Sequence, residues 1–141
     1  MNSSLLIFNP LPIICIIIFS VNNFYLKSEY SNWLTGKLSD LTFCFFCPLW
    51  LYSVVLFLKP QFTEKQKNIT ISLSTLFTAI LFTLMKTNIN FSQFHDLIQL
   101  KIWENLGVSP HKNILDISDL LALLSCIGAF YYGKSKIQKS H

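Results

Sequence analysis

Long apolar stretches constrain this chain more than any other feature of its sequence. Between Leu38 and Leu58, Asp40 is the single charged residue. About 20 residues of α-helix, rising about 1.5 Å each, cross the roughly 30 Å hydrocarbon core of a bilayer. A chain of 141 residues with 52% hydrophobic and only 13% charged residues also departs from the composition of soluble domains. We therefore expect an integral membrane protein.

Hydropathy predicts four spans and one amphipathic helix. The spans cover approximately residues 5–26, 38–58, 69–85 and 114–132. Apolar residues recur at helical spacing over residues 91–106, which predicts a helix lying in the membrane interface between spans three and four. The predicted fold class is all-α, a four-transmembrane-helix bundle with an additional interfacial amphipathic helix. The whole chain, residues 1–141, is expected to form a single integral membrane domain.

The basic residues indicate orientation and partners. All eleven are lysines without a basic stripe, which argues against nucleic-acid binding. Those in the loop after span two and in the C-terminal tail are Lys59, Lys65, Lys67, Lys134, Lys136 and Lys139. By the positive-inside rule this side is cytoplasmic, so both termini are predicted inside the cell. The lipid bilayer is the expected partner, and a homo-oligomer or a membrane-protein partner stays open.

A polar motif at the head of span two recurs at the head of span four. Leu38-Ser39-Asp40-Leu41 aligns with Ile117-Ser118-Asp119-Leu120 at an offset of 119 − 40 = 79 residues. Because both spans would run from outside to inside, the two Ser-Asp pairs are expected at similar depth near the outer surface. Ionisable residues at lipid depth are costly and commonly functional. We predict an outer-facing cluster that binds an ion or a small polar ligand or supports a membrane complex, formed by Lys37, Ser39, Asp40, Asp116, Ser118 and Asp119.

Three interpretations of these carboxylates stay open. Asp116 and Asp119 suit the start of a helix, where they would cap free backbone amides without any further chemistry. A carboxylate removed from water also suits an ion or proton pathway. A metal site with His95 or His111 is the third interpretation, but the ligand spacing is loose and no metal site is predicted.

The sequence Cys44-Phe45-Phe46-Cys47 offers an enzymatic alternative. A C-x-x-C pair in the outer half of a span resembles that of four-helix membrane oxidoreductases, which pass electrons from protein thiols to a quinone. That class uses a second reactive pair in an outer segment, and the outer connections of this chain contain no cysteine. Buried cysteine commonly acts as a small apolar residue. We favour a non-enzymatic protein without a cofactor, and a thiol-disulfide oxidoreductase using Cys44, Cys47 and a quinone is the alternative.

One longer motif resembles a known family. Trp33-Leu34-Thr35-Gly36-Lys37-Leu38-Ser39-Asp40, preceded by Asn22 and Asn23, is similar to the signature of an uncharacterised family of small bacterial multi-spanning inner-membrane proteins. The entry to the last span, Asp116 to Leu123, is similar to a later element of that family. Where the family shows an aromatic, a small residue and glycine, this chain has Leu41-Thr42-Phe43. The resemblance implies a bacterial inner (plasma) membrane protein of unassigned activity, without a catalytic residue to carry over.

Overall fold

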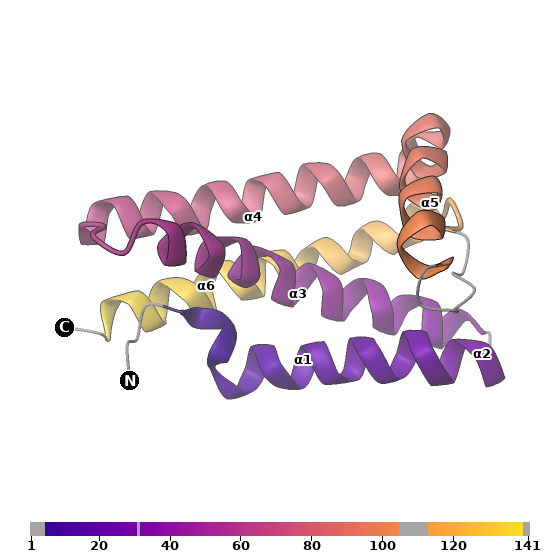
Figure 1. The fold of residues 1–141 in the computed structure, drawn as a ribbon, viewed down its shortest axis with the longest axis horizontal. Coiled ribbons are helices and arrows are strands. Elements are labelled where there is room, and N and C mark those ends of the chain that lie inside the picture. Colours follow the sequence, from indigo (N-terminus) through magenta and orange to yellow (C-terminus); the bar gives the residue numbers. More distant parts are fainter. Residues whose placement is uncertain (1–4, 31, 105–112, 140–141) are drawn as a thin grey trace. The chain divides into compact units, whose positions relative to one another are not determined.

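Helices make up all the regular structure in the described part of the chain (Figure 1). The computed structural model describes residues 5–30, 32–104 and 113–139. In chain order the elements are the 3₁₀-helix η1 (Leu6–Phe8), α1 (Pro10–Val21), the π-helix η2 (Asn22–Leu26), α2 (Lys27–Glu29), α3 (Trp33–Leu58), α4 (Glu64–Thr87), α5 (Ile89–Glu104), the 3₁₀-helix η3 (Ile117–Ala122) and α6 (Leu123–Gln138). The predicted all-α class is confirmed.

The predicted helices are present with different ends. α3 begins at Trp33 rather than at Leu38 because Asn32 caps it. The Asn32 side chain accepts a hydrogen bond from the Thr35 backbone N–H at 3.0 Å, and the Asn32 N–H donates to the Thr35 hydroxyl at 3.2 Å. This reciprocal pairing satisfies two amides that a helix start leaves free. Residues 105 and 106 of the predicted interfacial helix lie outside the described residues, and its remainder falls within α5.

Two helices in the described ranges are long and apolar enough to cross a membrane, judged by length and composition. They are α3 and α4, which contain the predicted spans 38–58 and 69–85. The apolar helix from Pro10 to Leu26 is shorter, and the region of the fourth predicted span is divided between η3 and α6.

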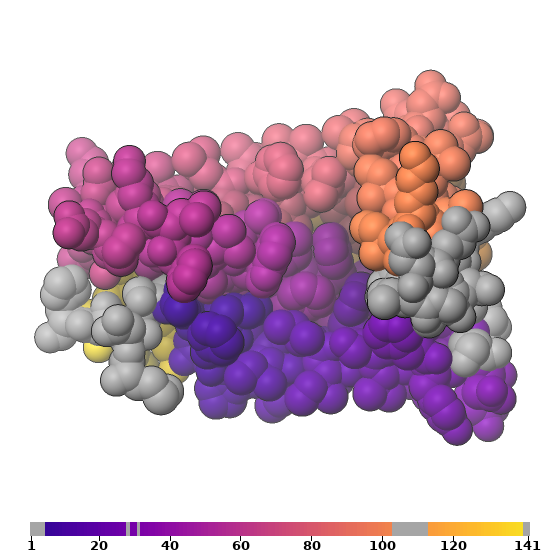
Figure 2. Space-filling model, viewed as in Figure 1, coloured from indigo at the N-terminus to yellow at the C-terminus, as the bar shows by residue number. Residues whose placement is uncertain are grey.

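The chain forms two compact units, and the first contains Met1–Ala79 and Ala122–His141. In this unit α1 and α6 both contact α3. A space-filling view shows side chains of α1 directly against those of α3 (Figure 2). The core of the unit consists of buried apolar side chains, whose removal from water stabilises the fold. They are Leu6, Leu49, Tyr52, Leu56, Ile71, Ala129 and Ile137.

The second unit contains Ile80–Leu121. Asn88 separates α4 from α5 and hydrogen-bonds to both helices. Its backbone N–H donates to the Leu84 carbonyl at 3.0 Å, and its side-chain Oδ1 accepts from the Phe91 N–H at 3.1 Å. Asn88 therefore ends one helix and caps the next. Figure 1 shows α5 turning sharply away from the axis of α4 at this point.

Gly133 allows three helices of the first unit to approach one another. A Cβ atom at Gly133 of α6 would lie 3.0 Å from Ile71 Cδ1 of α4 and 3.3 Å from Leu49 Cδ2 of α3. Small residues permit such close helix packing. A Cβ atom at Gly128, also on α6, would meet the Phe45 ring at 3.8 Å, which is ordinary van der Waals contact. The two glycines therefore differ in the space around them.

We expect Gly133→Ala to destabilise the protein and Gly128→Ala to leave it unchanged or more stable. Alanine is favoured over glycine in a helix by about 1 kcal/mol. At Gly133 the added methyl group must displace Ile71 or Leu49, and such overpacking costs about 1–3 kcal/mol. Thermal unfolding of the two purified variants measures the difference. Equal unfolding temperatures would contradict the close approach at Gly133.

Candidate functional site

The residues of the predicted outer cluster fall in both units, and each group is described by itself. The first unit holds Lys37, Ser39 and Asp40 on α3, and the second holds Asp116, Ser118 and Asp119 at the start of η3. Each triplet therefore lies within one unit. Their environments differ in burial and in hydrogen bonding.

Ser39 belongs to a buried polar network that joins η2 to α3. The side chain of Asn22 is fully buried, and its Nδ2 donates to the Thr35 carbonyl at 2.7 Å and to Ser39 Oγ at 2.5 Å. Ser39 Oγ donates in turn to Asn23 Oδ1 at 3.3 Å. A buried amide is costly unless it is hydrogen-bonded, so these bonds fix η2 against the first turns of α3.

The π-helical geometry of η2 accompanies this network. Asn22 and Asn23 are adjacent in sequence, yet both contact Ser39. Asn23 Nδ2 also donates to the Phe19 carbonyl of the preceding turn at 2.9 Å. π-helical turns are rare in proteins overall, and those that occur are often found at functional sites. Here the π-turn places two amide side chains on one hydroxyl.

Lys37 and Asp40 lie on one face of α3, and Ser39 lies on another. Residues three apart lie on one helix face, whereas Lys37 and Ser39 are about 200° apart at about 100° per residue. Lys37 and Asp40 are half-buried, and Lys37 Nζ lies 5.7 Å from the centre of the Trp33 ring. Ser39 therefore serves helix packing, and Lys37 with Asp40 forms the more accessible part of the motif.

The two cysteines of the C-x-x-C sequence have neighbours on different helices. The Cys44 thiol lies beside the thiol of Cys126 on α6. Cys47 Sγ accepts from the Thr78 hydroxyl of α4 at 3.6 Å. The cysteines in the described residues are unbridged thiols, and Cys44, Cys47 and Cys126 are buried. The thiol of Cys44 is thus paired across helices with that of Cys126.

A buried ion pair is the main polar feature of the second unit. Lys86 Nζ lies 2.7 Å from Asp119 Oδ2, and the two side chains are only 7% and 10% exposed. Lys86 is in the last turn of α4 and Asp119 in the first turn of η3. A cation is favoured at a helix C-terminus and an anion near an N-terminus, so each charge also suits its own helix end.

Asp116 shapes the start of η3. Its Oδ1 accepts from the Ser118 N–H at 2.8 Å, and its carbonyl accepts from the Asp119 N–H at 3.0 Å. This is the capping role expected of a carboxylate just before a helix. η3 continues as 3₁₀-helix from Ile117 to Ala122, longer than the three or four residues that such helices usually reach.

Asn113 ties the segment before η3 to α4 and α5. Its Nδ2 donates to the Met85 carbonyl at 2.7 Å and to Ser92 Oγ at 2.9 Å. Its backbone N–H donates to Asp96 Oδ1 at 3.1 Å. Because Met85 precedes Lys86, these bonds hold the chain leading to Asp119 beside the end of α4.

The sequence interpretation missed several residues of these sites. Lys86 looks like an ordinary flanking lysine, because its partner Asp119 is 33 positions further along the chain. The feature of the sequence that could have identified Lys86 is its position as a lone charge at the end of an apolar helix. His95 Nδ1 lies 3.4 Å from Asp96 Oδ1, and His111 is outside the described ranges. Within residues 5–30, 32–104 and 113–139, no group of three His, Cys, Asp or Glu side chains is placed to hold a metal ion.

Comparisons of the chain with family models, with curated proteins and with solved structures give no match. The chemistry of the buried polar groups is therefore what supports a functional proposal. The network around Asn22 is neutral, whereas the Lys86–Asp119 pair carries formal charges.

We expect Asn22→Ala to lower the free energy of unfolding by about 1–3 kcal/mol, because buried groups of α3 lose a partner. Asn9→Ala is the matched control, since the Asn9 side chain donates only locally, to the Leu6 carbonyl at 3.1 Å. The measurement is denaturant unfolding of both variants. A loss no larger for Asn22→Ala than for Asn9→Ala would show that the network does not stabilise the fold.

Asp119→Leu should destabilise the protein by about 3–5 kcal/mol, because it leaves the Lys86 ammonium buried without its carboxylate. Adding Lys86→Met should restore most of this loss, since apolar residues often replace a buried ion pair without cost. Glu29→Gln is the control for loss of an exposed acid and should have an effect within about 0.5 kcal/mol. A double variant no more stable than Asp119→Leu would contradict the pairing.

Proposed function

We propose that this chain is a multi-spanning protein of the bacterial inner membrane, with four spans near residues 5–26, 38–58, 69–85 and 114–132 and with α5 in the outer interface. The exposure of α3 and α4 supports the membrane location. Their most apolar windows are 44% and 22% buried, whereas the core helix of a soluble protein is mostly buried. Leu73, Leu76 and Phe77 of α4 are each more than half exposed, and lipid would cover them.

Helical structure in both regions supports the proposed first and fourth spans, although neither region reaches the length of α3 or α4. The apolar helix from Pro10 to Leu26 is near the lower limit of about 17 residues for a span. α6 alone has 16 residues, about 24 Å at about 1.5 Å per residue, and η3 directly precedes it in the chain. The bacterial inner membrane is suggested by the resemblance carried by the motif from Trp33 to Asp40.

Within this membrane protein we assign a non-enzymatic role, the binding of a small monovalent cation at Asp119. The observation that carries the proposal is the buried Lys86–Asp119 pair. A buried ion pair contributes little to stability, and ionisable residues in membrane bundles commonly mark ion sites. The Lys86 ammonium and a bound cation would compete for the same carboxylate, so binding would open the pair and the flexible lysine stem would carry the displaced ammonium toward water. Of the residues in the predicted cluster, Asp119 would therefore bind the cation, and Asp116 and Ser118 would form the start of η3.

A thiol-disulfide oxidoreductase that uses Cys44 and Cys47 with a quinone is the second candidate. The contact between Cys44 and Cys126 supports thiol chemistry in this region. We rank it below cation binding because reactive thiols are commonly partly exposed, whereas Cys44 and Cys47 are buried. A role in supporting a membrane complex is compatible with either candidate.

Cation binding should raise the unfolding temperature of the protein in nanodiscs. We expect sodium or potassium chloride to raise it relative to choline chloride at equal ionic strength, by roughly 9 °C at a hundredfold excess over Kd. Asp119→Asn should abolish the difference, and Glu29→Gln should retain it. The readout is tryptophan fluorescence during heating. Identical unfolding temperatures of the unmodified protein in all three salts would overturn cation binding.

A further inference from the structure

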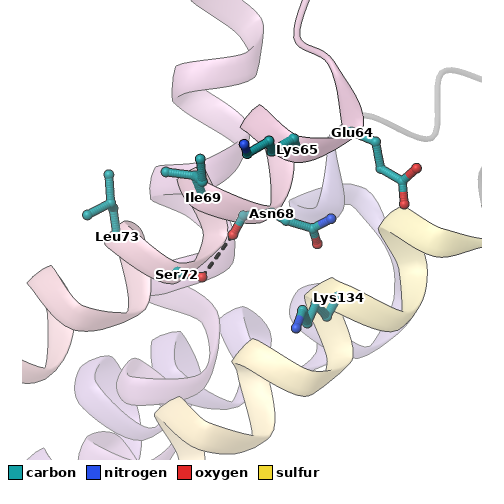
Figure 3. A pocket seen from close by; sticks show the side chains of 7 residues that line it. All are labelled: Glu64, Lys65, Asn68, Ile69, Ser72, Leu73 and Lys134. Carbon is teal, nitrogen blue, oxygen red and sulfur yellow. Dashed lines mark hydrogen bonds between the residues drawn. The ribbon is translucent and has the colours of Figure 1, made fainter.

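A pocket of about 560 Å³ lies between α4 and α6 in the first unit. Figure 3 shows its lining side chains, which come from the first turns of α4 on one side and from Lys134 of α6 on the other. A Cβ atom at the neighbouring Gly133 would lie 3.0 Å from Ile71 of α4, so the two helices are tightly packed beside the pocket. The backbone of α6 therefore lies close to Ile71 at this side of the pocket.

The lining changes character along α4. Lys65 lies at the start of the helix, Asn68 follows one turn later, and Ile69 and Leu73 complete the wall. Lys65 and Leu73 are about 12 Å apart along the helix, at about 1.5 Å per residue. The pocket therefore offers a charge at one end, a hydrogen-bonding amide in the middle and an apolar surface at the other end. A positive charge next to an apolar wall suits the phosphate and an acyl chain of an anionic phospholipid.

The charged end of the pocket is suited to an anion. Lys65 and Lys134 approach it from two helices, and the Glu64 carboxylate points away from the Lys65 ammonium in Figure 3. This is the lysine-rich side predicted to be cytoplasmic, where the membrane surface carries anionic lipids. Basic pockets between spans on that side are typical sites for anionic lipid headgroups.

Asn68 adds a requirement for a hydrogen-bond donor. Its side-chain Oδ1 is buried and has no hydrogen-bond partner among the described residues. Buried acceptors are normally satisfied, so the position favours a ligand that carries a donor. A hydroxyl group of a glycerol headgroup meets this requirement, whereas the headgroup of phosphatidylcholine has no donor.

We propose that this pocket binds an anionic phospholipid with a glycerol headgroup. The two lysines attract its phosphate from either side of the pocket, the flexible headgroup folds back so that a hydroxyl donates to Asn68 Oδ1, and an acyl chain follows Ile69 and Leu73. The inference rests on the proposed membrane location. It is independent of cation binding at Asp119.

The test compares phosphatidylglycerol with phosphatidylcholine of the same acyl chains, added to the detergent-solubilised full-length protein and detected by native mass spectrometry. We expect the unmodified protein to prefer phosphatidylglycerol. Lys65→Gln with Lys134→Gln should weaken its binding by roughly tenfold or more. Lys67→Gln with Lys136→Gln is the matched control, because it removes two charges from the same helices outside the pocket lining and should retain the preference. Unfolding temperatures without added lipid verify that both double variants are folded.

Three outcomes would overturn the lipid site. Equal losses in the two double variants would assign the effect to general charge, and no preference for phosphatidylglycerol would leave only an apolar groove. Displacement of the lipid by an equal concentration of glycerol phosphate would assign the pocket to a soluble phosphate. Alkaline carbonate extraction of cell membranes tests the membrane location separately. Release of the protein would reject that location, whereas retention without lipid preference would reject the lipid site alone.

Discussion

Buried polar side chains need hydrogen-bonding partners, and this requirement determines where helices join in each unit. Asn22 fixes η2 against α3, and Thr78 of α4 contacts Cys47 of α3. In the second unit, Asn113 fixes the segment before η3 to the end of α4. Apolar surfaces pack against many neighbours with similar energies, whereas each of these bonds has one geometry. The polar residues thus specify which parts of apolar helices meet.

Hydropathy and helical spacing were sufficient to predict the all-α class and the apolar helices α3 and α4, but not the ends of the helices or their division into shorter elements. The first turn of α3 contains Thr35, Gly36 and Lys37, so a scale of lipid preference excludes it. That turn is helical because of a hydrogen-bonding pattern at Asn32, to which hydropathy does not respond. The same argument applies to η3, where the bonds of Asp116 precede the apolar α6. Helix ends follow from capping, and helix interiors follow from apolar content.

The partners in the polar sites could not be predicted, although some of their members could. Asp119 is conspicuous in the sequence, but Lys86 is 33 positions away and Asn22 is 17 positions from Ser39. Pairings at such separations depend on tertiary packing rather than on local spacing. The repeated Ser-Asp motif illustrates this, because Ser39 is buried in an α-helix and Ser118 is exposed in a 3₁₀-helix. The same local sequence occupies two environments.

The exclusive use of lysine bears on both proposed sites. An ammonium on a flexible stem is a point charge that exchanges partners readily, whereas a guanidinium holds a carboxylate or phosphate in a fixed, bidentate geometry. At Asp119, exchange of Lys86 for a cation requires a bond that can open. At the pocket of α4 and α6, Lys65 and Lys134 are more accessible, and a mobile headgroup needs only attraction to positive charge. Burial therefore distinguishes the two roles of lysine. The buried Lys86 competes with a cation for the Asp119 carboxylate, whereas the more accessible Lys65 and Lys134 attract anions.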